Sequence, residues 1–256
     1  MPFLSEATSK LKYVRDRITE RAVRALPVST LNVTCIRPIV SFTFDDVPDT
    51  AHSAGAKILE DNGVRGTFYI AGGLLGKKEP DRDLISAEGC QLLSQSGHEI
   101  GCHTFAHKAV RTLSGEELRH DFDRNAEVLD SFDLSIGRRN FAYPYNQGSL
   151  RHRQAFAKRY TTARGGGDRI NRGLVNRSYL WGMEIRQPES DALSLVRQID
   201  AVVAQPGWLI FFAHDISRKP TPYGCTPDTF SVLVRYAVSK GCLVLPVRDA
   251  LQHIQE

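Results

Sequence analysis

The run Ile39-Val40-Ser41-Phe42-Thr43-Phe44-Asp45-Asp46 limits the possible folds of this chain more than any other stretch. Its apolar, β-branched and aromatic residues predict a buried strand. Neighbouring side chains on a strand point to opposite faces, so Asp45 and Asp46 can reach one site only if the chain turns there, and Val47-Pro48 indicates a turn. Two acids at the carboxyl end of a buried strand lie where α/β folds place their chemistry, so one can bind a cation and the other can act as a base. The alternative is a loop that simply begins with two solvated acids.

Strands and helices alternate from Ile39 onward. The predicted strands are Pro38–Phe44, Gly66–Ala71, His98–His103, Asn140–Pro144, Tyr160–Arg164, Leu180–Arg186, Trp208–Ala213 and Cys242–Pro246. The predicted helices are Thr50–Asn62, Ile85–Ser96, Gly115–Phe132, Leu150–Lys158, Asp191–Ala204 and Pro227–Lys240, and Ser114 with Glu117 forms a capping box before the third. Repeated strand–helix units with continuous apolar strands indicate a mostly parallel sheet that is covered on both faces.

The length of 256 residues and the composition, 41% hydrophobic and 24% charged, suit one soluble α/β domain. No linker, repeat or low-complexity tract divides the chain. Seven or eight strand–helix units within roughly 215 residues favour a closed, irregular (β/α) barrel over an open sheet. The fold prediction is therefore an α/β barrel of seven or eight mostly parallel strands over residues 31–256, preceded by an extra N-terminal helix within residues 1–30.

That helix, residues 4–26, carries one apolar stripe and stops before Pro27. Its other face is rich in arginine and lysine. The helix can dock on the domain, mediate a homodimer or make peripheral contact with a membrane surface. A secretory signal would have an uninterrupted apolar core, which is missing here, and the apolar run 208–213 is far shorter than the ~20 residues that span a bilayer. We therefore expect a cytoplasmic protein.

The charge of the chain indicates which kinds of partner to expect, and its cysteine content indicates the redox compartment. The 33 basic and 29 acidic residues give a formal net charge of +4, spread along the chain. No basic block interleaved with aromatic residues appears, so nucleic acid is not an expected partner. The five cysteines are odd in number and have no CxxC spacing, which favours buried thiols in a reducing compartment.

Reactive side chains follow four of the predicted strands, namely at Asp45-Asp46, at His103 to His107, at Tyr143-Pro144-Tyr145 and at Ala213-His214-Asp215. His103 and His107 are four residues apart just beyond a strand, so both imidazoles can reach one point. With Asp46 they supply two nitrogens and one oxygen for a divalent cation and leave positions open for water and substrate. This composition predicts a hydrolytic metal site.

The same motifs resemble those of the polysaccharide deacetylase family, metal-dependent enzymes that remove N- or O-acetyl groups from chitin oligomers, peptidoglycan and related glycans. Thr43-Phe44-Asp45-Asp46 is similar to the first family motif, and His103-Thr104-x-x-His107 matches the second. Phe141 to Tyr145 is similar to the third, and Phe211-Phe212-Ala213-His214 to the last. The motifs occur in the family's order, and the resemblance covers about residues 35–250.

The resemblance implies a role for each motif residue. Asp46, His103 and His107 would bind the metal, and Asp45 would take a proton from the attacking water. The Tyr145 backbone N–H would stabilise the oxyanion, and His214 would protonate the leaving amine. Thr104 would brace the histidine loop. Tyr143, Pro144 and Arg164 are expected to contact the substrate.

The chain also departs from the family pattern at three places. Val47 stands where a glycine is usual, and its position before Pro48 predicts extended backbone. Ala142 stands where many members have an arginine that steadies the catalytic carboxylate, so either Arg164 or Arg186 is expected to replace that arginine. The acid that orients the general-acid histidine has no clear match, and Asp168 is the candidate.

These observations predict a metal-dependent hydrolase that deacetylates an N-acetylated sugar, oligosaccharide or glycan precursor. Zinc is the expected metal, and Co²⁺, Ni²⁺ and Fe²⁺ suit the same ligands. Two alternatives stay open: a metal-dependent hydrolase of another amide or ester, such as one on a lipid-linked sugar, and a catalytically silent homologue that binds glycans.

Overall fold

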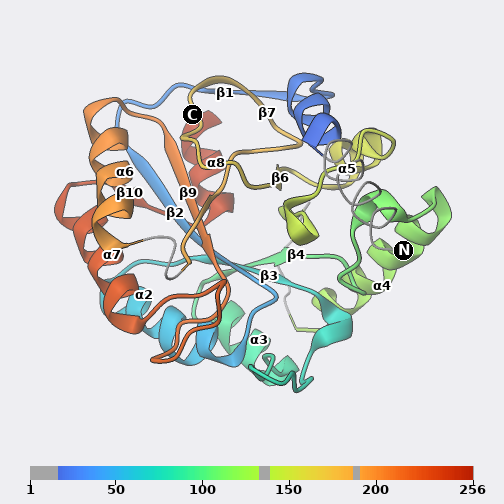
Figure 1. Cartoon of the computed structure of the whole chain (residues 1–256), viewed down its shortest axis with the longest axis horizontal. Helices are drawn as coiled ribbons and strands as arrows, with labels where there is room; N and C mark the ends of the chain where they lie inside the picture. The colour runs from blue at the N-terminus through green and yellow to red at the C-terminus, as the bar shows by residue number, and fades with distance from the viewer. Residues whose placement is uncertain (1–16, 133–138, 187–190, 256) are drawn as a thin grey trace, which may run out of the picture.

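A single curled sheet forms the centre of the protein (Figure 1). The computed structural model describes residues 17–132, 139–186 and 191–255. Within these residues eight strands pair in parallel, in the spatial order β6-β5-β4-β3-β2-β9-β8, with β10 beside the start of β2. Their bounds are β2 (Ile39–Asp45), β3 (Thr67–Ile70), β4 (Glu99–Cys102), β5 (Phe141–Ala142), β6 (Ala163–Arg164), β8 (Met183–Glu184), β9 (Trp208–Ala213) and β10 (Leu243–Val244). The predicted irregular (β/α) barrel is confirmed, in the form of a sheet curled into a half-barrel whose end strands are β6 and β8.

Strand β2 is the centre of this sheet, and all seven of its residues are buried. It pairs with β9 from Ile39 to Phe44 along one edge, while β10 and β3 share the other edge. Phe44 stacks on Phe68 of β3 with ring centroids 4.7 Å apart, and Phe42 stacks on Phe211 of β9 at 5.5 Å. Phe42 and Phe44 are two residues apart and therefore pack on one face of the sheet, while the alternate residues of the strand are buried on the other face. Burial on both faces explains why the run ending in the two aspartates forms the most enclosed strand.

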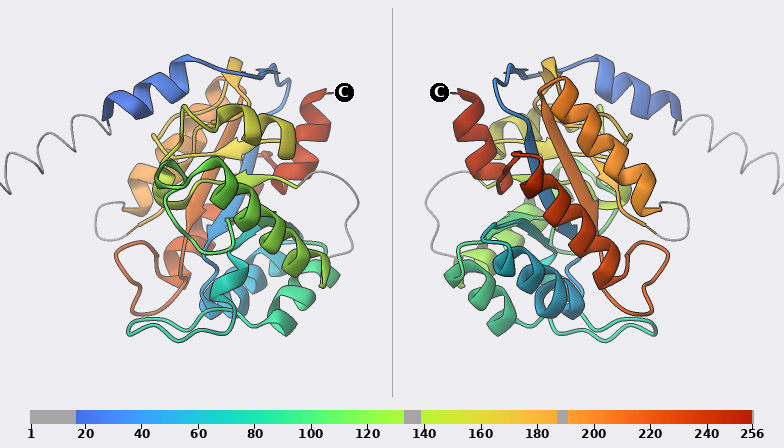
Figure 2. Two further views of the ribbon diagram at one scale, coloured as in Figure 1. Left: turned by 90° about the vertical axis from the view of Figure 1, so that its right-hand side faces the viewer. Right: turned by 90° about the vertical axis from the view of Figure 1, so that its left-hand side faces the viewer.

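Helices cover the outside of the sheet (Figures 1 and 2). The six predicted helices are confirmed, although the first is π-helical in its first half. The capping box is also confirmed, because Ser114 Oγ accepts from Glu117 N at 3.2 Å and Glu117 Oε2 accepts from Ser114 N at 2.7 Å. The bounds are η1 (Ala51–Ala56), α2 (Lys57–Asp61), η2 (Gly72–Leu74), α3 (Ala87–Gln95), η3 (Val110–Thr112), α4 (Gly115–Asp130), η4 (Pro144–Asn146), α5 (Arg153–Arg159), α6 (Ala192–Ala204), α7 (Pro227–Ser239) and α8 (Val247–Gln255).

Six described elements were not predicted from the sequence: β1 (Thr30–Val33), β7 (Gly173–Asn176), helix α8 and the three-residue helices η2, η3 and η4. The first two form a separate antiparallel pair. Each strand is four residues long and partly exposed, which gives too short a pattern to distinguish from a loop. Together with α8 they build a second apolar cluster around Trp208 at the amino end of the parallel strands.

The N-terminal helix docks on the barrel. Residues 17–25 are helical, and the remainder of the predicted helix, 4–16, lies outside the described residues. Val23 is 3% exposed and belongs to the main core, and its carbonyl accepts a hydrogen bond from Asn176 Nδ2 at 2.9 Å. Tyr179 Oη donates to Glu20 at 2.8 Å. Figure 2 shows this helix along the outside of the domain.

Two further sequence expectations concern cysteines and membrane spans. All five cysteines are free thiols, and four of them are buried, as predicted. In the described part of the chain, every helix is too short or too polar to cross a bilayer.

Candidate active site

The two aspartates at the end of β2 reach one site because the backbone turns between them. Asp45 completes the strand, whereas Asp46 and Val47 both adopt left-handed backbone, with φ of 57° and 56°. The prediction of extended backbone at Val47 is therefore wrong. Val47 accepts a hydrogen bond from Ile85 N at 3.1 Å and is fully buried, so tertiary contacts outweigh the local preference of a residue before proline.

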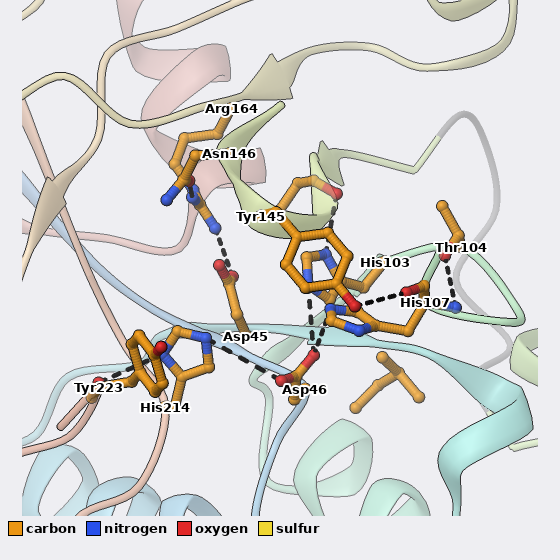
Figure 3. Close-up of polar contacts among 12 residues, drawn as sticks. Asp45, Asp46, His103, Thr104, His107, Tyr145, Asn146, Arg164, His214 and Tyr223 are labelled. Carbon is orange, nitrogen blue, oxygen red and sulfur yellow. Dashed lines mark hydrogen bonds and ion pairs between the residues drawn. The ribbon is translucent and has the colours of Figure 1, made fainter. Parts of the chain in front are cut away.

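Asp46, His103 and His107 converge from the ends of β2 and β4, and one ligand atom from each lies within 4.8 Å of the others (Figure 3). Asp46 Oδ1 lies 2.9 Å from His107 Nε2 and 3.5 Å from His103 Nε2. This oxygen is buried and makes no hydrogen bond to the described residues. Two imidazole nitrogens around an unsatisfied carboxylate oxygen fit the ligand set of a divalent cation.

Contacts behind His103 hold its ring in the orientation that a metal ligand would need. Its Nδ1–H donates to the Ala142 carbonyl at 2.8 Å, which leaves the Nε2 lone pair directed at Asp46. Burial lowers the pKa of His103 to about 4, despite the opposing effect of Asp45. Burial alone would raise the pKa of Asp46, but the neighbouring imidazoles of His107 and His103 hold it well below its ordinary value. A neutral His103 beside an ionised Asp46 is the combination of protonation states in which an imidazole and a carboxylate ligate a metal.

The loop that carries both histidines is held by two side chains. Thr104 and His107 have φ of 66° and 50°, and Thr104 Oγ1 accepts from His107 N at 3.0 Å, which is the bracing role expected of this threonine. Asp121 of α4 accepts from the backbone N–H groups of Phe105 at 2.8 Å and Ala106 at 2.9 Å. Sequence reasoning missed Asp121, because a single acid in an amphipathic helix resembles an ordinary solvated residue.

Arg164, and not Arg186, pairs with Asp45. The two side chains form a buried ion pair, each at most 4% exposed. Arg164 is the register partner of Ala142 on the neighbouring strand, so its side chain emerges beside the position where an arginine was expected. Burial alone would raise the pKa of Asp45, but Arg164, His103 and His214 together hold it below its usual range. Asp45 is therefore anionic and lies outside the metal-ligand set.

His214 approaches from the end of β9, on the other side of Asp46 (Figure 3). Its Nε2 lies 4.0 Å from Asp46 Oδ2, and its Nδ1–H donates to the Tyr223 carbonyl at 3.2 Å. The orienting partner is thus a carbonyl and not Asp168, whose carboxylate accepts from Glu184 N at 3.3 Å. The loop that supplies Tyr223 is fixed by Asp215, which accepts from Thr221 N at 2.9 Å.

A cavity of about 460 Å³ opens over these groups. Its lining comprises Asp45, Asp46, Glu79, Arg82, His103, His107, Tyr145, Asn146, Glu184, Arg186, His214 and Tyr223. The Tyr145 ring is 60% exposed and lies 4.8 Å from the His107 ring, measured between centroids.

Besides Asn146, Glu184 and Tyr223, the cavity residues that were not among the predicted site residues are Glu79 and Arg82. Arg82 donates to Asp46 Oδ2 at 2.9 Å and to Glu79 at 2.7 Å. They lie in a loop without a motif, so nothing in the sequence pointed to them.

The three residues that were predicted to contact the substrate lie deeper in the protein than the cavity lining. Tyr143 is 1% exposed and donates through its hydroxyl to the Ser178 carbonyl at 3.0 Å. Pro144 is buried, and Arg164 faces Asp45. All three lie outside the lining of the cavity.

Comparison with protein families gives the same reading as the geometry. The family model described as polysaccharide deacetylase matches residues 33–162, about half of the chain. The chain belongs to the polysaccharide deacetylase family. Membership places it among the deacetylases and carbohydrate esterases, which are hydrolases. The matched segment contains Asp45, Asp46 and both histidines.

Two relatives show how far the similarity extends. A chitin deacetylase of Colletotrichum lindemuthianum is 33% identical over 104 residues, which are 39% of this chain and 41% of that protein. This match therefore spans about two fifths of the relative's length. A chitooligosaccharide deacetylase of Azorhizobium caulinodans is 27% identical over 191 residues, 74% of this polysaccharide deacetylase family member and 75% of the relative.

Solved structures share the fold at low sequence identity. A family 4 acetyl xylan esterase from Clostridium thermocellum, in complex with a cobalt ion, superposes with a TM-score of 0.59 at 20% identity, covering 84% of this chain and 90% of that one. A CE4 family pseudoenzyme from Bacillus anthracis superposes with a TM-score of 0.60 at 13% identity, covering 87% and 69%. The fold therefore occurs in both active and inactive proteins. Whether a protein with this fold is an enzyme depends on the side chains of its site.

Proposed function

We propose that this member of the polysaccharide deacetylase family is a divalent-metal-dependent hydrolase that removes acetyl groups from an N-acetylated sugar or glycan. The observation that carries the proposal is the division of labour between adjacent carboxylates. Asp46 faces the two histidines, whereas Asp45 is kept anionic by Arg164 outside that ligand set. A pair of acids with separate environments suits a metal ligand next to a general base.

Asp46, His103 and His107 would hold the metal, and zinc, cobalt, nickel or iron suits these donors. A bound divalent cation would supply a Lewis acid that polarises the amide carbonyl and makes a water easier to deprotonate. Asp45 then accepts the proton of that water as it attacks the carbonyl carbon. The Tyr145 backbone N–H donates to the developing oxyanion, and a preorganised donor of this kind contributes about 3 kcal/mol.

His214 completes the reaction as the general acid. Its Nδ1–H is engaged by the Tyr223 carbonyl, so the proton given to the departing amine leaves from Nε2, the atom that faces the cavity. After that transfer the imidazole is neutral and keeps its bond to Tyr223. Donation from the ring nitrogen opposite a fixed carbonyl is a usual geometry for a histidine acid.

Acetate release from chitin oligomers and peptidoglycan fragments tests the proposal. Activity should disappear after chelation and return with Zn²⁺ or Co²⁺. Asp45→Asn should lower kcat by about 10²-fold or more while the metal content stays unchanged, because Asp45 is a base and not a ligand. Release that needs neither metal nor Asp45 would exclude this function.

The same assays separate the alternatives. Release from acetylated xylan or from a lipid-linked amide, but not from N-acetylated oligomers, would assign another ester or amide as substrate. Glycan binding without acetate release, even with added Zn²⁺ or Co²⁺, would assign a catalytically silent homologue. The cytoplasmic location, and a dimer or membrane contact through residues 4–26, stay predictions.

A further inference from the structure

A second cavity lies next to the active site. It measures about 430 Å³ and shares Tyr145 and Asn146 with the active-site cavity, so the two cavities adjoin at these residues. Its opposite wall is the N-terminal helix, which contributes Arg17, Arg21 and Arg24. We call this cavity the arginine groove. The arginines that the N-terminal helix contributes to this groove are not part of the family motifs.

The arginine groove carries excess positive charge. Among the described residues of the lining, Arg111 of η3 joins the three helix arginines and Glu20 is the one acid, so these residues carry a formal charge of +3. Glu20 is already engaged, because it pairs with Arg111 and accepts from Tyr179 Oη at 2.8 Å. The Nε of Arg24 is buried and makes no hydrogen bond to the described residues.

The active-site cavity has the opposite balance. Four acids line it against two arginines, and both arginines are paired: Arg82 contacts Glu79 and Asp46, and Arg186 lies 3.4 Å from Glu184. A divalent cation on the ligand set would bring this lining close to neutrality. The neutral acetamido sugar therefore belongs in the active-site cavity, and an anionic group belongs in the arginine groove.

We propose that the arginine groove binds a phosphate or carboxylate group carried by the same glycan whose acetyl group is removed. Guanidinium groups bind both kinds of oxyanion through paired N–H donors, so several arginines facing one cavity form a site of this chemistry. The substrate class is then an anionic acetylated glycan. This inference rests on the proposed function and names its substrate.

Three matched substrates test it: di-N-acetylchitobiose, its 1-phosphate, and the disaccharide oxidised to a carboxylate at its reducing end. The wild-type protein should deacetylate at least one charged form with a kcat/KM at least tenfold above the neutral form. The phosphate and carboxylate arms show which anion is preferred. Because the contact is electrostatic, 0.5 M NaCl should reduce this preference.

A double variant, Arg17→Gln with Arg21→Gln, removes two groove charges from the surface of the helix. The ratio of kcat/KM for the charged over the neutral substrate should fall at least tenfold, through a higher KM. The matched control is Arg235→Gln on α7 with Lys240→Gln at the C-cap of that helix, which removes the same charge from residues that line neither cavity. The control should keep the wild-type ratio.

Binding can be measured without catalysis. The guanidinium of Arg24 lies 4.6 Å from the centroid of the Trp181 ring, and the other tryptophan, Trp208, is fully buried. Titration with inorganic pyrophosphate should change the Trp181 fluorescence of the wild type, and this change should be lost in Trp181→Phe and weakened in the Arg17/Arg21 double variant.

The two proposals fail in different ways. If acetate is released with equal kcat/KM for neutral and charged substrates, and the double variant behaves in the same way, the proposal of an anion site in the arginine groove is wrong. The proposed hydrolase function would be unaffected by this result. Saturable pyrophosphate binding in a protein that releases no acetate would support the groove and overturn the hydrolase. The absence of any pyrophosphate-dependent signal in such an inactive protein would overturn the groove as well.

Discussion

The ion pair between Arg164 and Asp45 is the residue contact on which the proposed base depends. The guanidinium lies 4.4 Å from the centroid of the Phe212 ring and 5.4 Å from that of Tyr69. Burial and the aromatic surroundings of the guanidinium leave both charges poorly solvated, so each stabilises the ionised form of the other. The pair therefore serves both stability and the protonation state of Asp45.

Replacing Arg164 with Gln should affect stability first. The variant leaves the buried Asp45 carboxylate without its cation, and breaking a buried pair in this way costs about 3–5 kcal/mol. Denaturant unfolding at pH 7 should show this loss. The matched control is Arg186→Gln, whose partly exposed pair with Glu184 should change stability by less than ~1 kcal/mol. Equal effects of the two variants would contradict this reading.

The same variant should shift the pH dependence of activity. Asp45 has a folded-state pKa below its ordinary value, so its contribution to stability is present above the unfolded pKa near 4 and is lost as the pH falls through the lowered pKa. Without Arg164, burial acts with less opposition and the pKa rises. The acidic limb of the kcat/KM profile should therefore move to higher pH in Arg164→Gln, and an unmoved limb would argue that Asp45 is not the base.

Residue types and spacing predicted that Asp46, His103 and His107 meet at one site, but they could not choose between Arg164 and Arg186 as the partner of Asp45. The choice depends on register: β6 pairs with β5 so that Arg164 lies beside Ala142, and a two-residue strand carries no register signal of its own. The Tyr223 carbonyl that accepts from His214 could not be predicted either, because every residue has a backbone carbonyl and the residue type does not reveal which one acts as the acceptor.

At the scale of elements, strand ends and the loops that follow them build the site. The positive φ angles of non-glycine residues gather here: Asp46 and Val47 after β2, Thr104 and His107 after β4, and Tyr145 and Asn146 after β5. Each such residue costs about 1–3 kcal/mol, which neighbouring contacts must offset. Helix α4 supplies one of these contacts through Asp121.

Asp121→Asn should weaken metal binding. The amide can still accept one hydrogen bond, but its NH₂ group would face the other backbone N–H and distort the loop that carries His103 and His107. Partners of this kind typically change metal affinity by 10–100-fold, which calorimetric titration of the metal-free protein with Zn²⁺ measures directly.

The control for Asp121→Asn lies at the start of the same helix. Ser114→Ala removes the helix cap and should cost about 1 kcal/mol of stability without changing Zn²⁺ affinity. If both variants weakened Zn²⁺ binding equally, the effect would be general destabilisation and not loop geometry.

Long apolar strands and amphipathic helices were predictable, because their periodicity extends over enough residues. β9 was predicted with its observed bounds, Trp208–Ala213. The pair β1–β7 was not predictable, because its strands come from sequence positions 140 residues apart and each buries only part of its surface.

For the whole molecule, a cation at Asp46, His103 and His107 would link loops after β2 and β4 that are far apart in the chain. A ligand that binds only the folded state stabilises it by about 2.7 kcal/mol at a concentration 100-fold above its Kd. Zn²⁺ should therefore raise the Tm of the metal-free protein in a concentration-dependent way. His107→Ala should abolish this rise, and a variant that kept it would place the cation elsewhere.

The enclosure of β2 has a consequence for how the protein opens. This strand has partners along both edges and no exposed residue, so its amide hydrogens should be among the last to exchange with deuterated solvent. The two aspartates stand at its end. Outer helices can thus fray and close again many times while the point from which both carboxylates project keeps its shape, and this point is lost only when the molecule unfolds as a whole.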